Sequence, residues 1–97
     1  MTGLTYLIFL ICTGSMTGTL CPQTNTSLII PLNGTIILPN ETINNGSIYA
    51  YYDTSRGYQF TIHRAIAQTQ DYITFKGDNN EYSETIHKSR VVLKIDT

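Results

Sequence analysis

The chain has no segment with the apolar period of a helix, and it has six short stretches with the composition of strands. No window of 11 or more residues places apolar side chains every three or four positions. Short apolar and aromatic runs alternate instead with segments rich in Gly, Asn, Thr and Pro. We expect strands at 28–32, 35–38, 48–52, 58–63, 72–75 and 89–96. This pattern predicts an all-β, antiparallel sandwich or barrel.

The pair Asn33-Gly34 lies between the first two of these runs and predicts a hairpin. Both residues tolerate positive φ, which a two-residue hairpin turn requires. Pro31 has no amide proton to give to a neighbouring strand, so we expect its strand to lie at a sheet edge.

The run 48–52 carries apolar or aromatic side chains at successive positions and therefore predicts a central strand buried on both faces. The run 58–63 alternates apolar with polar residues, as a half-buried strand does. Residues 64–70 are ambiguous, because Ala65, Ile66 and Ala67 also suit one helical turn. The polar stretch 76–84 predicts a loop.

The apolar run 4–12 is followed by small residues, as in a secretory signal peptide. It is too short to cross a bilayer, which needs about 20 apolar residues. We expect residues 1–18 to be a signal peptide, with cleavage between 14 and 20, and residues 19–97 to be one domain. The alternative is a buried strand or helix at the start of a cytosolic domain, since the first three residues carry no Lys or Arg.

Four Asn-x-Ser/Thr acceptors support export, and we predict N-linked glycans at Asn25, Asn33, Asn40 and Asn45. No charged residue precedes Glu41, so these acceptors lie in or next to the least polar part of the chain. The net charge is −1 and no basic patch exists, which argues against a nucleic-acid partner. The sequence predicts a secreted protein, or a surface protein if a membrane anchor lies in a missing C-terminal part.

Removal of residues 1–18 takes Cys12 away and leaves Cys21 without an internal partner. An unpaired cysteine in an exported protein predicts an intermolecular disulfide, and so a homodimer or a bond to another chain. The neighbouring Pro22 and the nearby new N-terminus offer nothing that would activate the thiol as a nucleophile.

In the order of its features, the stretch from Ser27 to Asp96 resembles an immunoglobulin V-type domain, closest to the outer domain of the signalling lymphocytic activation molecule family. Residues 34–39 resemble strand B, with Leu38-Pro39 where many V domains have Cys. Residues 48–52, 58–63 and 89–96 resemble strands C, C′ and D. The chain lacks the Trp of strand C, and Tyr51 or Tyr52 would have to fill that pocket. An immunomodulatory glycoprotein of a large DNA virus is a source that this resemblance suggests.

The resemblance implies a partial V-type sandwich with strands A to D, because the Tyr corner before strand F is absent. It implies open edges on strands B and C, and hence self-association. It also implies adhesion, receptor binding or immune modulation through the C–C′ face. The tyrosines there either form an interface or fill a core that has no Trp. The predicted binding residues are Tyr49, Tyr51, Arg56, Tyr58 and Arg64.

The sequence predicts no enzyme, no metal and no cofactor. His63 and His87 lie apart from any Cys or carboxylate at ligand spacing, and we interpret them as an exposed strand residue and a loop residue. The tripeptide Lys76-Gly77-Asp78 resembles an integrin-binding loop, although a charged turn explains it equally simply. The second hypothesis for the whole chain is a complete, toxin-like accessory protein that dimerises through Cys21.

Overall fold

The computed structural model describes residues 4–12, 16, 20–21, 29–38, 41–53 and 59–96. It has no α-helix in this part of the chain, so the all-β, sandwich-like prediction is confirmed. A short 3₁₀ helix spans Lys88–Arg90. The strands are β1 (Thr5–Ile11), β2 (Ile29–Ile36), β3 (Ile48–Asp53), β4 (Gln59–Gln68), β5 (Tyr72–Lys76), β6 (Glu84–His87) and β7 (Val91–Asp96).

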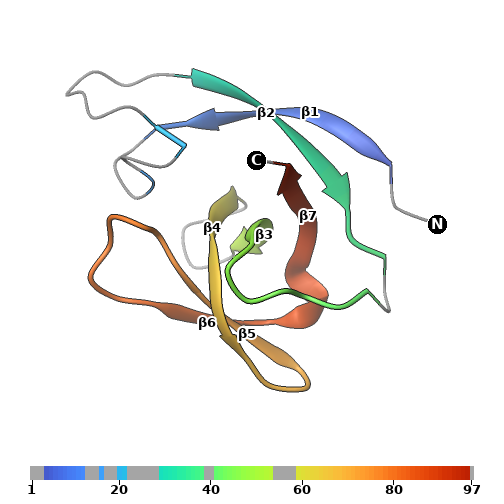
Figure 1. The fold of residues 1–97 in the computed structure, drawn as a ribbon, viewed down its shortest axis with the longest axis vertical. Coiled ribbons are helices and arrows are strands. Elements are labelled where there is room, and N and C mark those ends of the chain that lie inside the picture. The colour runs from blue at the N-terminus through green and yellow to red at the C-terminus, as the bar shows by residue number, and fades with distance from the viewer. Residues whose placement is uncertain are drawn as a thin grey trace.

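All seven strands belong to one antiparallel sheet in the order β1-β2-β7-β3-β4-β5-β6. The sheet curls strongly, so that the β1–β2 pair and the β5–β6 pair lie at opposite ends of the molecule (Figure 1). Because the two ends bend toward opposite faces of the middle strands, both faces of the sheet centre are covered.

The central strand is β3, which pairs with β7 on one side and β4 on the other. Five of its six side chains are buried, which confirms the prediction that the run 48–52 is buried on both faces. Alternate residues of β3 therefore enter two different cores, since successive side chains of a strand point to opposite faces. The open edge expected for this strand is wrong, because β7 occupies that side.

The first core, here called the aromatic cluster, lies on the face covered by β5 and β6. Its largest members are Tyr49, Tyr51 and Phe75, all fully buried. The rings of Tyr51 and Phe75 stack with centroids 4.3 Å apart, and Tyr49 meets Phe75 edge-on at 6.3 Å. The remaining members are Ile43, Ala65, Ile73, Ile86 and Val91. These aromatic rings fill the space that a Trp would take in a larger core.

The second core, here called the disulfide cluster, lies under the β1–β2 pair. It contains Met16, Cys21, Ile48, Ala50, Ile62 and Ile95, with Ile8, Leu10 and Leu32 among the half-buried residues packed on it. A disulfide joins Cys12 to Cys21 across 5.9 Å between their Cα atoms. In the full chain Cys21 thus has an internal partner. The unpaired Cys21 expected for a product that lacks residues 1–18 stays a prediction.

The hairpin predicted at Asn33-Gly34 is wrong, because β2 runs straight through both residues. Gly46 is the one described glycine with positive φ, and no other described residue has it, so neither Asn33 nor Gly34 makes a turn. Gly34 serves a different purpose. A Cβ there would lie 3.3 Å from Leu93 Cδ1 and 3.4 Å from Leu93 Cβ, so the missing side chain lets β7 approach β2 closely.

Two bulges interrupt the alternation that the sequence suggested. Val92 has no partner between the pairs Tyr51↔Val91 and Ala50↔Leu93, so Val91 enters the aromatic cluster while Leu93 packs on the disulfide cluster. Residues 91, 93 and 95, which alternation would place on one face, are therefore divided between the two cores. Ile66 is the extra residue in β4, which settles residues 64–68 as strand rather than helical turn. β6, within and just beyond the expected loop, was not predicted.

Candidate functional site: a groove beside Arg64

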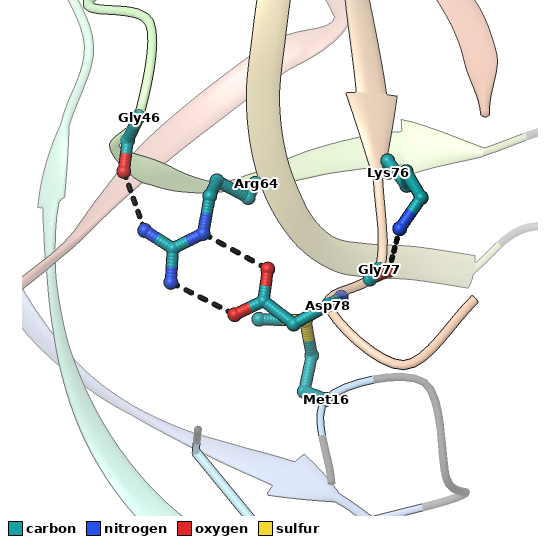
Figure 2. A network of polar contacts seen from close by, with 6 residues as sticks. All are labelled: Met16, Gly46, Arg64, Lys76, Gly77 and Asp78. Carbon is teal, nitrogen blue, oxygen red and sulfur yellow. Dashed lines mark hydrogen bonds and ion pairs between the residues drawn. The ribbon is translucent and has the colours of Figure 1, made fainter. Parts of the chain in front are cut away.

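Arg64 of β4 is the centre of a network of polar contacts (Figure 2). Its Nε donates to Asp78 Oδ1 at 2.9 Å and its Nη2 donates to Asp78 Oδ2 at 2.8 Å. Its Nη1 donates to the carbonyl of Gly46 at 2.6 Å. One planar side chain thus joins three elements: the strand β4, the loop after β5 and the turn before β3.

The electrostatics keep Arg64 charged. The hydrogen bonds that Arg64 donates to the Asp78 carboxylate raise the pKa of Arg64 above its usual value, burial opposes this in part, and the negative charge of Asp78 adds to the rise. The Asp78 amide also donates to the sulfur of Met16 at 3.3 Å, which holds the Asp78 loop against the disulfide cluster.

A groove of about 350 Å³ opens beside this network. It is lined by Gly46, Ser47, Ile48, Arg64, Lys94, Ile95 and Asp96. The lining thus includes two cationic residues, one Ser and one Asp, together with the buried Ile48 and Ile95. In the strand register Arg64 lies opposite Ile48 and Lys94 lies opposite Tyr49, so the two cationic side chains leave the sheet on opposite faces. Asp96 is itself positioned by Thr35, whose hydroxyl donates to both carboxylate oxygens at 3.1 and 3.4 Å. Such a surface suits a polar segment of a partner protein.

Two of the four predicted glycan acceptors border this groove. Asn45 directly precedes the lining residues Gly46 and Ser47, and Asn33 is the register partner of Asp96. Both Asn side chains are exposed. Gln68 Nε2 donates to Asn45 Oδ1 at 3.0 Å, which leaves the Asn45 amide nitrogen free of that contact for a glycan. Asn25 and Asn40 lie outside the described residues.

The predicted binding face keeps one described member at the surface. Tyr49 and Tyr51 are fully buried, so their prediction as contact residues is wrong. The physical reason is that β3 is covered on both faces, which leaves no outward position for either ring. Arg64 is half-buried and lines the groove. Arg56 and Tyr58 lie outside the described residues. The lining residues Lys94 and Asp96 were missed, although their spacing of two residues on β7 places both side chains on the same face of the strand.

The tripeptide Lys76-Gly77-Asp78 does not present its carboxylate to a partner. Both oxygens of Asp78 accept from Arg64, Gly77 is buried, and Lys76 Nζ lies 3.5 Å from the Gly77 carbonyl. The structure therefore supports the simpler interpretation of a charged turn.

A second polar cluster joins Tyr51, His63 and Glu84 inside the aromatic cluster. The Tyr51 hydroxyl donates to Glu84 Oε1, and His63 Nδ1 lies 3.1 Å from the same hydroxyl oxygen. His63 is buried, so the expectation of an exposed strand histidine is wrong, whereas His87 is exposed. The adjoining cavity measures about 20 Å³, room for about one water.

Comparison of the chain with protein-family models, with curated proteins and with solved structures found no match. Among the described residues no group of three His, Cys, Asp or Glu side chains could hold a metal ion. None of the helical segments described is long and apolar enough to span a membrane.

Proposed function

We propose that this chain is exported as a secreted or surface-attached glycoprotein and binds a cell-surface protein through the groove beside Arg64. The observation that carries the proposal is the position of two exposed acceptor asparagines, Asn45 and Asn33, each next to a residue that lines one charged groove, in sequence or in strand register. The apolar leader and the four acceptors supply the route out of the cytosol. Adhesion, receptor binding and immune modulation are the activities that suit such a domain.

Binding would use Lys94 and Arg64 as donors and Asp96 and Ser47 as polar partners, all of them residues that line the groove. Arg64 is fixed by Asp78 and Gly46, so it would lose little conformational entropy when a partner binds. The resemblance to a V-type domain belongs to this proposal, with the contact moved from the tyrosines to the groove.

Expression of the full chain, tagged at its C-terminus, in cultured human cells tests the export step. We expect protein in the medium whose mass falls when glycans are removed enzymatically. Ser47→Ala deletes one acceptor and leaves Asn45 with its contact to Gln68, so it should lose the mass of one glycan. Ser83→Ala, at an exposed serine outside any acceptor, is the matched control and should lose none. Unglycosylated protein retained in the cytosol would refute the proposal.

Binding of the purified, fluorescently labelled product to a panel of human cell lines tests the groove. We expect Lys94→Glu to weaken binding at least about tenfold, because it reverses one of the two cationic side chains of the groove. Lys88→Glu makes the same charge change in the 3₁₀ helix, away from the lining residues, and should leave binding unchanged. Equal loss in both variants, or no binding to any line, would refute the groove as the site.

A further inference from the structure

The outer edge of β2 is a ready strand-binding site that β1 fills in the full chain. Ile36 donates its amide to the carbonyl of Leu4, and Ile37 donates to Val92 of β7. Because the backbone groups of successive residues point to opposite sides of a strand, Ile30, Leu32, Gly34 and Ile36 turn their N–H and C=O groups toward β1. Removal of residues 1–18 leaves all of these groups without β1.

This edge carries none of the usual protection against pairing. No charged residue occurs between 29 and 38, and none of the β1-facing positions is a proline. Pro31 is on the β2 strand, but its ring nitrogen faces the β7 side, where β7 pairs only with Asn33 to Ile36. The proline predicted to mark an edge thus leaves the edge next to β1 fully able to pair.

The side chains beneath the edge also need a cover. Leu32 is half-buried against the disulfide cluster, where Ile8 and Leu10 of β1 pack beside it. In the register of the β1–β2 pair, Ile8 lies opposite Leu32 and Leu10 lies opposite Ile30. The slot therefore takes an Ile-x-Leu segment that runs antiparallel to β2.

β2 itself contains that segment, Ile30-Pro31-Leu32. We propose that residues 19–97 form a two-fold dimer in which β2 of each copy pairs with β2 of the other, with Pro31 opposite Pro31 on the two-fold axis. In this register the second copy's Ile30 takes the place of Ile8 and its Leu32 takes the place of Leu10. The backbone hydrogen-bonding groups also match. The even-numbered residues of β2 point their N–H and C=O groups toward this edge, and in this register they lie opposite even-numbered residues of the second copy. Asn33 stands on the outer face, so its glycan leaves the edge open.

This dimer rests on the proposed function, because it forms only once β1 has been removed. It also differs from a dimer made by Cys21, whose thiol loses Cys12 at the same step. All tests therefore use the secreted product of the full chain with Cys21→Ser. Its mass is measured first, and its oligomeric state next, by size exclusion with light scattering. A chain that stays inside the cells and keeps residues 1–18 refutes the export proposal and the dimer together, whereas a secreted monomer that begins near residue 19 refutes the dimer alone.

A matched pair of charge variants identifies the edge. Ile30→Lys places a cation at an edge position that is not packed on the disulfide cluster, and we expect the dimer dissociation constant to rise at least about a hundredfold. Ile29→Lys adds the same charge one residue away, on the exposed outer face, and should change the dissociation constant less than about threefold. Equal effects, or none, would contradict the proposal.

Disulfide trapping tests the register. Two residues directly opposite each other in a non-hydrogen-bonded antiparallel pair have Cα atoms about 4.5 Å apart, within the range of a disulfide. Pro31→Cys should therefore give a covalent dimer on a non-reducing gel. Ile29→Cys is the control, because the two copies of this residue would lie about 13 Å apart, four strand residues along the pair. A covalent dimer from Ile29→Cys and none from Pro31→Cys would exclude this register.

Discussion

Arg64 and Asp78 face each other in a two-point ion pair that joins β4 to the loop after β5. The two hydrogen bonds measure 2.9 and 2.8 Å, and the two side chains keep 33% and 21% of their surface exposed. The same guanidinium also holds the turn before β3 through Gly46, so Arg64 ties both segments to β4.

Loss of this ion pair should destabilise the domain modestly. Asp78→Ala removes both acceptors of Arg64 and should lower the free energy of unfolding by about 1 kcal/mol, since the pair is partly exposed to solvent. Asp71→Ala, at an exposed Asp whose side chain does not contact Arg64, is the control and should change stability by less than about 0.5 kcal/mol. Urea unfolding followed by circular dichroism measures both, and equal values would contradict the assignment.

The Tyr51 hydroxyl should contribute to the stability of the domain separately from the packing of the Tyr51 ring. Tyr51→Phe keeps the stack on Phe75 but removes the oxygen that links His63 and Glu84. We expect a loss of about 1 to 3 kcal/mol, because buried polar groups are left without that partner. Thermal and urea unfolding report the change.

The control for the buried hydroxyl is Tyr72→Phe, which deletes the same atom at a ring that is 49% exposed. It should alter stability by less than about 0.5 kcal/mol. If both variants behave like the parent protein, the hydroxyl does not organise the core.

Gly46 should be required for its backbone conformation. Its φ of 95° is a conformation that side-chain-bearing residues rarely adopt, and nothing lies within 4 Å of an added Cβ. Gly46→Ala should therefore cost about 1 to 2 kcal/mol through backbone strain alone. The Asn-x-Ser acceptor survives the change, so a glycan at Asn45 can be followed in the same protein.

Gly34→Ala tests side-chain packing in place of backbone strain, because the φ of Gly34 is not positive and Leu93 lies close to it. The added methyl would press on Leu93 at 3.3 Å, so the cost should come from packing between β2 and β7. Leu93→Ala in the same chain should recover part of the stability lost by Gly34→Ala but none of that lost by Gly46→Ala. Rescue of both variants would refute the distinction.

Local composition predicted the sheet centre well. β3 carries apolar and aromatic side chains at consecutive positions, and only a strand covered on both faces accommodates them. The start of β4 followed from alternation, and the short run 72–75 was expected as the strand that is β5. These predictions depend on neighbours in sequence, which a single chain displays directly.

The features that were predicted wrongly depend on contacts between residues far apart in the chain. Asn33-Gly34 has the composition of a turn, but the pairing of β2 with both β1 and β7 keeps it extended. The burial of Tyr49 and Tyr51 depends on strands that lie up to about 40 residues away, and the Arg64 groove on a turn, a loop and the last strand. Arg64 was the part of the site that the sequence predicted, as an Arg of the expected C–C′ binding face.

The first residue of the exported product tests the central claim most directly. Intact-mass measurement of the protein collected from the medium, before and after removal of N-linked glycans, gives both the cleavage point and the number of glycans. The account predicts a chain that begins between residues 15 and 21, carries glycans that include Asn33 and Asn45, and lacks β1. An intracellular chain that begins at Met1, bears no glycan and keeps the disulfide between Cys12 and Cys21 would contradict it.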